Sequence, residues 1–286
     1  MKPNLMILGA SGGLANAVLH SLVHHRNLFN RLILLDKNKK VLRNPYLNHQ
    51  NLKYGFIHKE LRSERMKEYQ TLLKKHKINI VLDLTDALTI PLIITTNRAG
   101  IDYINTSIND DNKTSPELLS EIFSKRSAWK KARTILCSGM NPGNVNMWAR
   151  HGIDKYGVPK EIIHFEYDTS MSRKWKAMIT WSIREFIQED IHDPGGIVLG
   201  KDKIKWLYPN ALSHHVEMKS ILSPILKLEK YPKGCLVLHE ENITISHKYN
   251  IPSKFIYAVH PQTLQALLRI YKKEKNVSRK DLQLAD

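Results

Sequence analysis

Apolar runs alternate with helical patterns along the first half of the chain. The runs cover residues 5–9, 32–36, 78–84, 103–107 and 134–140. Amphipathic segments of helical period separate them, at residues 14–25, 60–76, 91–99 and 115–132. Strands that are apolar on both sides, with helices between them, are typical of a parallel sheet whose two faces are covered. The pattern therefore predicts an α/β fold, with a doubly wound parallel sheet over residues 1–142.

The rhythm of the sequence changes after Pro142. Strand-like segments at residues 162–168, 235–246 and 255–260 now cluster with one marked helix at residues 180–190 and another after Pro261. This mixture predicts an α+β substrate domain over residues 143–286. Neither a repeat nor a low-complexity linker separates the two halves, so we expect a turn near residues 141–145 between them.

The chain is strongly basic, with 44 Lys and Arg against 27 Asp and Glu and a formal net charge of +17. Such a charge makes nucleic acid the first partner to consider. The lysines are scattered, however, and mostly end helices or fill loops, where cations are favourable without any ligand. No strand combines aromatic and basic residues in the manner of RNA-binding motifs. We therefore expect no nucleic-acid partner.

The composition also bears on location. No apolar run reaches the roughly 18 residues of a membrane-spanning helix. The apolar start of the chain runs directly into glycines and is too short for the core of a signal peptide. Cys137 and Cys235 form neither a disulfide framework nor a metal-binding pattern. The expectation is a cytoplasmic protein with no membrane partner and no metal site.

A glycine turn joins the first predicted strand to the first predicted helix. Gly9, Ala10, Ser11 and Gly12 form this turn, and with Ala15 they give the pattern G-x-x-G-x-x-A. Glycines at this point let a pyrophosphate approach the backbone and sit at the positive end of the helix. The turn and the parallel sheet together predict a Rossmann-type domain that binds a dinucleotide.

Asp36 ends the second predicted strand, 27 residues after Gly9. A carboxylate there accepts hydrogen bonds from the ribose hydroxyls and repels a 2′-phosphate, which favours NAD over NADP. The alternative is that Asp36 only begins a turn, where aspartate is common. Lys37, Asn38 and Lys39 leave NADP open.

Polar residues follow the later strands of the predicted sheet. Thr85 and Asp86 come after one strand, and Thr106 lies at the end of the next. Ligands of open α/β sheets bind outside the carboxyl ends of the strands. We therefore expect these residues near the nicotinamide half of the cofactor. Asn141, in the turn at 139–143, belongs to the same edge.

The segment 181–190 reads WSIREFIQED. In an α-helix, one face of this segment would carry Trp181, Glu185, Gln188 and Glu189. An indole face attracts an ammonium group, and a carboxylate makes burial of that cation tolerable. The alternative is that Trp181 belongs to an apolar core and that the acidic residues face solvent.

Six segments, in order along nearly the whole chain, resemble the homospermidine synthases, a branch of the saccharopine dehydrogenase-like enzymes. They are GMNPGNV (139–145), DYINTSIND (102–110), FEYDTS (165–170), TWSIREFIQED (180–190), CLVLHEENITIS (235–246) and YAVHP (257–261). The resemblance implies NAD-dependent transfer of an aminobutyl group from one putrescine to another. The reaction proceeds through imine intermediates, with no net redox change.

The same resemblance implies roles for particular residues. Trp181 would bind the substrate cation, and Glu189 would be the substrate carboxylate. Glu166 is expected at the second amine site, His260 in proton transfer, and Asn141 at the substrate or the nicotinamide amide. His239 and Glu241 match the family as well.

The sequence departs from the family in three respects. Asn109 stands where the family has glutamate, and Arg184 stands where an acidic residue is frequent. The family also continues beyond LQLAD, so we expect an incomplete second domain whose apolar surface is covered in a homodimer.

Two other functions stay open. One is an NAD(P)-dependent oxidoreductase of an amino or imino acid, with Arg184 or Lys174 at the carboxylate. The other is a truncated, non-catalytic remnant that binds dinucleotide.

Overall fold

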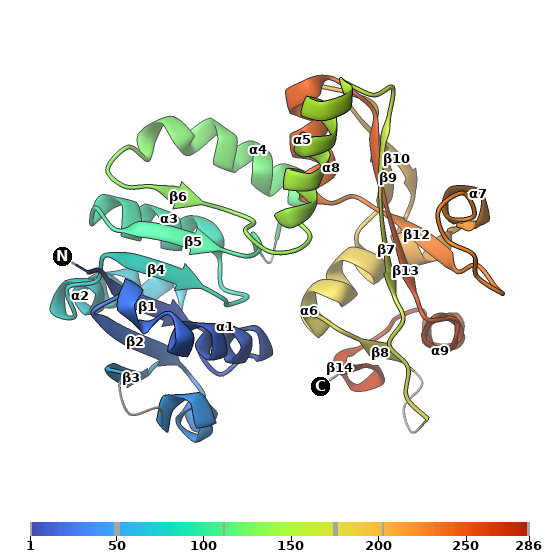
Figure 1. The fold of residues 1–286 in the computed structure, drawn as a ribbon. Helices are drawn as coiled ribbons and strands as arrows, with labels where there is room; N and C mark the ends of the chain where they lie inside the picture. The colour runs from blue at the N-terminus through green and yellow to red at the C-terminus, as the bar shows by residue number, and fades with distance from the viewer. Residues whose placement is uncertain (1, 49–51, 111, 174–176, 202, 285–286) are drawn as a thin grey trace. The chain divides into compact units, whose positions relative to one another are not determined.

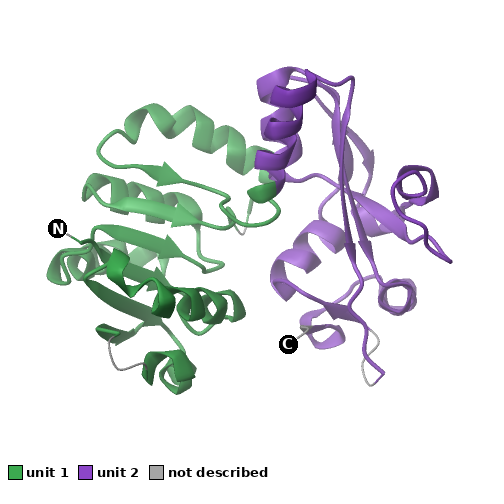
Figure 2. Cartoon of the chain, viewed as in Figure 1, with its two compact units in different colours: residues 1–144 green, residues 145–286 purple. Residues whose placement is uncertain are grey.

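The computed structural model describes residues 1–286 except 1, 49–51, 111, 174–176, 202 and 285–286 (Figure 1). The chain forms two compact units, Met1–Asn144 and Val145–Asp286 (Figure 2). The boundary predicted from the sequence lies two residues earlier, at residue 142.

The first unit is built on a parallel sheet with the strand order β3-β2-β1-β4-β5-β6. The strands are β1 (Asn4–Leu8), β2 (Arg31–Asp36), β3 (Tyr54–His58), β4 (Ile80–Asp83), β5 (Asp102–Asn105) and β6 (Thr134–Ile135). The chain moves outward from β1 to β3 and then returns to β4, so the order reverses between β1 and β4. Ligands of doubly wound sheets bind at such a switch point. The predicted doubly wound parallel sheet is confirmed.

Both faces of this sheet are buried, which explains the continuous apolar runs. Met6 and Leu8 of β1 belong to one apolar cluster, whereas Ile7 between them belongs to another. The first cluster includes residues of α2 (Met66–Lys75) and α3 (Thr89–Arg98), and the second includes residues of α1 (Gly13–His24). A fourth helix, α4 (Ser115–Lys125), begins with a capping box formed by Thr114 and Glu117.

Some predicted boundaries in the first unit are wrong. The expected strand at 134–140 is only Thr134–Ile135, because Cys137 has a left-handed backbone with a φ of 56°. The backbone N–H of Cys137 donates to the side chain of Asn105 instead of continuing the ladder. The helix expected at 115–132 ends as an α-helix at Lys125. Strand β3 was not predicted.

The second unit is α+β, as predicted. Its main sheet has the order β10-β9-β13-β12-β11, and β7 pairs with β13 in parallel. The strands are β7 (Ile162–Asp168), β9 (Gly195–Val198), β10 (Ile204–Tyr208), β11 (His215–Glu217), β12 (Lys233–Val237) and β13 (Ser253–Val259), while β8 (Met178–Ile179) pairs with β14 (Gln283–Leu284). The helices are α5 (Asn144–Tyr156), α6 (Ile183–Phe186), α7 (Lys219–Leu222), α8 (Glu240–Tyr249) and α9 (Pro261–Glu274).

The strand expected over 235–246 is wrong in its second half. The strand β12 ends at Val237, and residues 240–249 form α8. His239 is extended and precedes the helix, and Glu240 and Glu241 occupy the first turn, where negative charge interacts favourably with the helix dipole. Burial of Ile243 and Ile245 outweighs the preference of β-branched residues for strands.

The helix expected over 180–190 also differs. Ser182 caps α6, so Trp181 lies before the helix, and the segment Ile187–His192 continues as a π-helix. The backbone N–H of Asp193 bonds to the carbonyl of Gln188, five residues earlier, at 2.7 Å. The shared α-helical face of Trp181, Glu185, Gln188 and Glu189 is therefore not formed.

The register of the second sheet decides which side chains share a face. His164, Glu166 and Asp168 of β7 pair with Phe255, Tyr257 and Val259 of β13. Cys235 and Val237 of β12 pair with the same strand, opposite Tyr257 and Phe255. Paired residues point to the same side of a sheet. This face packs against α9 and the segment 183–192, whereas Leu236 and Ile256 join a separate cluster.

Asp83 is a buried carboxylate in the first unit. It accepts hydrogen bonds from the hydroxyl of Tyr103 at 2.5 Å, from the hydroxyl of Thr85 at 2.6 Å and from the N–H of Thr85 at 3.0 Å. Burial raises the pKa of Asp83 from 3.8 to about 6, although the bonds from Thr85 and Tyr103 oppose this shift.

Replacement of Asp83 by asparagine should therefore change how stability depends on pH. Because the pKa in the folded state is raised, the stabilisation from the protonated carboxyl is present below pH 3.8 and is lost as the pH rises through 6. An asparagine side chain does not titrate. As the pH rises between the two pKa values, Asp83→Asn should therefore gain stability relative to the unchanged chain, by up to roughly 1.4 kcal/mol per pH unit. Thermal unfolding at several pH values measures this difference. A difference that does not vary with pH would contradict it.

Candidate functional site

The glycine turn after β1 requires glycine for a steric reason. Gly9 has a φ of +75°, and a Cβ atom there would lie 2.6 Å from the carbonyl oxygen of Leu84. The N–H of Gly9 donates to the carbonyl of Leu35 at 3.0 Å, and the N–H of Gly12 donates to Gly9 at 3.1 Å. The turn is thus held against the ends of β2 and β4.

The N-terminus of α1 suits an anion. Gly12 is the N-cap, and in the described structure no side chain caps the helix and no acidic residue lies in its first turn. A Cβ atom at Gly13 would meet nothing within 4 Å. The first N–H groups of a helix have no partners within it and carry its positive dipole end. Residues 9–13 therefore fit the pyrophosphate of a dinucleotide. Ala10 and Ser11 complete this turn.

Asp36, the residue expected at the ribose, also holds the glycine turn. One carboxylate oxygen accepts the N–H of Ser11 at 2.8 Å, and the other accepts the N–H of Asn38 at 2.6 Å. Its exposed fraction is only 7%. The carboxylate therefore orders the pyrophosphate turn from beside it, a role that sequence analysis missed. Carboxylate oxygens have further lone pairs that can accept ribose hydroxyls.

Thr85 lies beside the glycine turn, because a Cβ atom on Gly9 would come within 3.0 Å of the Thr85 methyl group. The amide of Asn109 donates to the carbonyl of Thr85 at 3.3 Å, and the N–H of Asn109 bonds to Thr89 at 2.8 Å. Asn109 therefore braces the loop after β4, which includes Asp86. This is a structural reason for asparagine at that position.

The turn at 139–143 lies beside the end of β5. The N–H of Gly139 donates to the carbonyl of Pro142 at 2.9 Å, and the peptide between Asn141 and Pro142 is cis. A Cβ atom on Gly139 would lie 3.2 Å from the carbonyl oxygen of Thr106. The first unit thus brings Thr106 next to the turn that carries Asn141. Their contact with a cofactor stays a prediction.

In the second unit, carboxylates surround His239. Its Nδ1 atom contacts Glu241 and lies 3.2 Å from Glu240, and its Nε2 atom lies 3.5 Å from Glu189. The His239 ring stacks on Phe255 at 5.0 Å. The side chains of Glu189 and Glu241 are 15% and 0% exposed, so these charges interact away from bulk water.

The pKa values in this group are shifted by burial and by mutual charge. Burial favours neutral His239, but the carboxylates of Glu241, Glu189 and Glu240 raise its pKa well above 6.5. Burial raises the pKa of Glu240 to about 7. Burial and the charge of Glu189 raise the pKa of Asp190 well above 3.8. The arrangement favours an imidazolium among carboxylates that compete for protons.

His239, Glu240 and Glu241 also have potential metal-ligand atoms within 4.8 Å of one another. The Nδ1 atom of His239 is, however, bonded to Glu241 directly. His239 and Glu241 are arranged as an ion pair.

Trp181 is half-buried against the core of the second unit. Its Nε1 atom donates to the hydroxyl of Tyr257 at 2.9 Å, and its ring makes edge contacts with Phe186 and Tyr257 at 5.9 and 6.0 Å. Glu166 is the neighbour of Tyr257 in the strand register. His260 caps α9, and its Nδ1 atom accepts the N–H of Gln262 at 3.2 Å.

The structure thus joins Glu189 to His239 and Trp181 to Tyr257. Sequence analysis gave no role to Glu240, Asp190, Asp168 or Tyr257. The acidic pair after an apolar strand, Glu240 and Glu241, was a usable signal. Lys174 lies outside the described residues.

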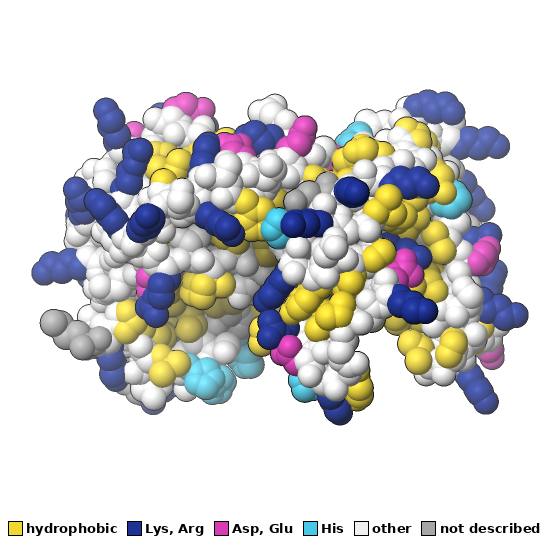
Figure 3. Space-filling model, turned by 90° about the horizontal axis from the view of Figure 1, so that it is seen from above, with side chains coloured by type: hydrophobic (Ala, Val, Ile, Leu, Met, Phe, Trp, Pro, Cys, Tyr) yellow, Lys and Arg dark blue, Asp and Glu magenta, His cyan; other side chains and the backbone are white. Residues whose placement is uncertain are grey.

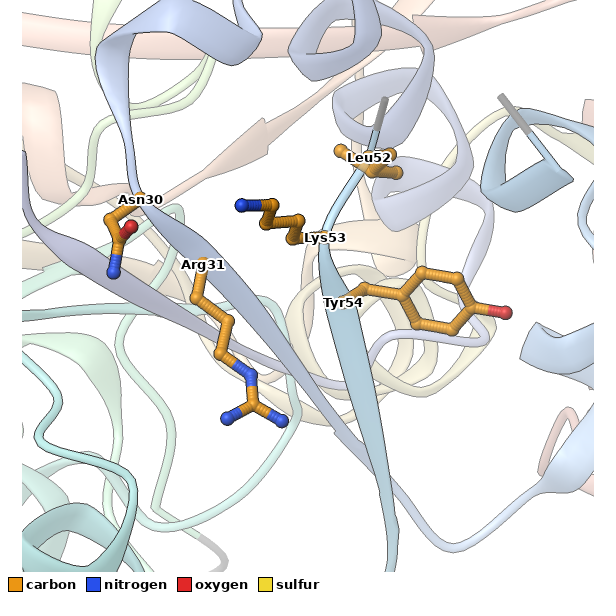
Figure 4. A pocket seen from close by; sticks show the side chains of 5 residues that line it. All are labelled: Asn30, Arg31, Leu52, Lys53 and Tyr54. Atoms are coloured by element: carbon orange, nitrogen blue, oxygen red, sulfur yellow. The ribbon is translucent and has the colours of Figure 1, made fainter. Parts of the chain in front are cut away.

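A surface cavity of about 490 Å³ lies elsewhere in the first unit. Asn30, Arg31, Leu52, Lys53 and Tyr54 line it (Figure 4). Arg31 and Tyr54 begin β2 and β3, so the cavity lies at the amino ends of the strands. The glycine turn and Thr85 lie at the carboxyl ends.

Lys and Arg side chains are dispersed on the face in Figure 3 and do not gather into one patch. None of the helices in the described part of the chain combines the length and apolar character needed to cross a bilayer.

Comparison with known proteins identifies the first unit. Residues 5–137 match the family described as "Saccharopine dehydrogenase NADP binding domain". The first unit therefore contains an NAD(P)-binding domain, which confirms the predicted dinucleotide site in its general form. No curated protein sequence matches the chain.

Similar solved structures include myo-inositol 2-dehydrogenase from Lactobacillus plantarum, with a TM-score of 0.51 and 10% identity over 91% of this chain and 70% of that chain. An apo scyllo-inositol dehydrogenase from Lactobacillus casei gives a TM-score of 0.49 and 12% identity over 91% of this chain and 69% of that chain. At 10% identity, the similarity to myo-inositol 2-dehydrogenase shows a shared fold and says nothing about the substrate of this chain.

Gly12→Ala should weaken dinucleotide binding without unfolding the first unit. Gly12 has an ordinary extended backbone, and its Cβ atom would meet only the carbonyl of Gly9, at 3.4 Å. The added methyl group would occupy the approach to the helix N-terminus, so the affinity for NAD should fall roughly tenfold or more. Calorimetric titration measures the affinity.

Gly152→Ala is the matched control, because a Cβ atom there meets nothing within 4 Å in the second unit. If Gly12→Ala and Gly152→Ala bound NAD equally well, the pyrophosphate would not lie at this turn.

Proposed function

We propose that this protein is an NAD(P)-dependent oxidoreductase that acts on the carbon–nitrogen bond of a cationic amine. The dinucleotide domain supports the redox chemistry. The observation that carries the choice of substrate is the buried group of carboxylates around His239 in the second unit.

The charge of this group favours a cation over a carboxylate. When Glu189, Glu240 and Glu241 are all ionised, the imidazolium of His239 leaves excess negative charge. Excess charge of one sign in a buried place is costly unless a counter-charge is present. A substrate ammonium supplies that counter-charge, whereas a substrate carboxylate would add to the repulsion. Arg184 is an exposed residue and lies 3.7 Å from Glu185. It therefore gives little support to an amino-acid carboxylate.

The residues of this group suit amine chemistry in two ways. A bound nicotinamide supplies the hydride acceptor and donor. The substrate ammonium first loses a proton to give a neutral amine, and transfer of a hydride from the adjacent carbon to the nicotinamide then leaves an iminium, with positive charge on the substrate nitrogen. Fixed carboxylates such as Glu189 stabilise that developing charge. His239, held between carboxylates, is a group that can hold a proton and release it.

The resemblance to homospermidine synthases supports a finer proposal, aminobutyl transfer from one putrescine to another. Putrescine carries an ammonium at each end of an alkyl chain. Trp181 adds an aromatic face to the carboxylates of the second unit, and an ammonium on such a face gains about 0.5–2 kcal/mol. The specific observation in its favour is that Trp181 retains partial exposure although it packs against the core.

Incubation of purified protein with putrescine and either NAD or NADP tests the proposal, with products identified by mass spectrometry and NADH or NADPH by absorbance. Homospermidine with no net reduced cofactor supports the transferase. Reduced cofactor with an oxidised amine supports a simple oxidoreductase. If neither forms and putrescine does not bind, the amine proposal fails. If the protein then still binds dinucleotide, the result supports a non-catalytic remnant that binds the cofactor.

The cofactor is proposed to be NAD, and Asp36→Asn should shift the preference toward NADP. The substitution removes a charge that repels a 2′-phosphate, so the ratio of NADP to NAD affinity should rise roughly tenfold. Titration with each cofactor measures the ratio. Asp154→Asn, at an exposed carboxylate of the second unit, is the control. An equal loss for both cofactors would mean that Asp36 acts only through the glycine turn.

Glu189→Gln should raise the KM for putrescine roughly tenfold and leave the affinity for NAD unchanged, because it removes one partly buried negative charge near His239. Initial rates and calorimetry measure the two quantities. Glu217→Gln is the matched control, since Glu217 is 65% exposed and pairs with Lys233 on the surface. Loss of NAD binding in Glu189→Gln would instead indicate a folding defect.

A further inference from the structure

A directed chain of hydrogen bonds links Trp181 to a carboxylate. The indole Nε1 of Trp181 donates to the hydroxyl of Tyr257 at 2.9 Å, and that hydroxyl donates to Asp168 at 3.4 Å. An indole N–H can only donate and a carboxylate can only accept, so the direction of both bonds is fixed. Burial raises the pKa of Tyr257 well above 10, so its hydroxyl keeps the proton that it donates.

Asp168 also holds the backbone beside Trp181. The same oxygen of Asp168 that accepts from Tyr257 accepts the hydroxyl of Thr180 at 2.8 Å and the N–H of Thr180 at 3.1 Å. Its other oxygen accepts the N–H of Ser170 at 2.9 Å. Thr180 directly precedes Trp181, so one buried carboxylate fixes both the main chain and, through Tyr257, the side chain of Trp181. Two points of attachment determine the orientation of the indole ring.

Ring packing supports the same orientation. The Trp181 ring meets Phe186 and Tyr257 at interplanar angles of 75° and 88°. Phe186 and Tyr257 also contact each other, with ring centroids 6.1 Å apart. Such edge-to-face contacts are sensitive to rotation of any one ring. The three rings belong to different parts of the chain, and the hydrogen bond between Trp181 and Tyr257 prevents these two rings from rearranging independently.

We propose that Asp168 and Tyr257 are positioning residues that orient the Trp181 indole toward the ammonium group of the substrate. This inference rests on the proposed function, in which a cationic amine binds in the second unit. The attraction of a cation to an indole depends on its lying over the ring face, so a freely rotating indole would bind it more weakly. A purely structural role would affect stability and leave recognition of the amine unchanged.

Tyr257→Phe removes the hydroxyl and keeps the ring. Tyr271→Phe is the matched control, because the hydroxyl of Tyr271 makes a 2.8 Å bond with Asn210 and its ring packs against the same core. In ¹⁵N-labelled protein, the indole resonance of Trp181 is assigned by its absence from Trp181→Phe. We expect this resonance to shift and its proton to exchange faster in Tyr257→Phe, and to stay in place in Tyr271→Phe.

The second readout is kinetic, with putrescine and NAD as the probes. Loss of this hydrogen bond should raise the KM for putrescine about fivefold, with little change in kcat or in NAD affinity. Asp168→Asn should change KM in the same direction, and it supplies the same test if Tyr257→Phe unfolds below the assay temperature. Tyr271→Phe should behave like the unchanged protein.

The outcomes separate this inference from the proposed function. If Trp181→Phe raises KM but neither Tyr257→Phe nor Asp168→Asn does, the positioning role is overturned and the amine site stands. An unshifted Trp181 resonance in Tyr257→Phe overturns it as well. If Trp181→Ala, which removes the aromatic face, leaves KM unchanged, Trp181 does not contact the amine, and the inference fails with that part of the proposed function. Absence of putrescine binding by the unchanged protein overturns both.

Discussion

The parallel pairing of β7 with β13 is the constraint on which the candidate site of the second unit depends. Side chains of a strand alternate between its two faces, so this register puts Glu166 and Asp168 on the same face as Tyr257. A slip of one residue would turn both carboxylates toward the apolar cluster on the other face. Asp168 would then lose its hydrogen bonds with Thr180 and Tyr257, and the chain of hydrogen bonds that orients Trp181 would be broken. Strand register and candidate chemistry are therefore specified together.

In the first unit, the candidate site depends in a similar way on fixed backbone atoms. Gly9 lets the chain pass so close to the end of β4 that no side chain fits, and Asp36 holds the turn through the N–H of Ser11. An anion at the helix N-terminus and a ribose beside Asp36 would both meet groups that are fixed before binding. Groups ordered in advance lose less conformational entropy when a ligand arrives. The carboxylate of Asp36 thus holds the shape of the turn before any ligand is bound.

The parallel sheet and the glycine turn were predictable from sequence, because buried strands and a strand–glycine–helix order depend on neighbouring residues. The geometry around Trp181 was not. Ser182 starts the helix one residue after it, and the π-helix that follows changes the spacing on which the expected face relied. Residues 240–249 form a helix despite β-branched side chains, because burial outweighed local preference. The contact of Glu189 with His239 joins residues 50 positions apart, which periodicity does not report.

The carboxylates around His239 are difficult to explain as a stabilising feature alone. Breaking a buried ion pair is costly, but an apolar group of the same size is often as stable as the intact pair. Here the acidic side chains outnumber the imidazole, and burial raises the pKa values of Glu240 and Asp190, so the folded protein resists ionising them. A cation bound beside them lowers that cost, because it favours the ionised forms. Whatever supplies the positive charge is therefore coupled thermodynamically to the stability of the second unit.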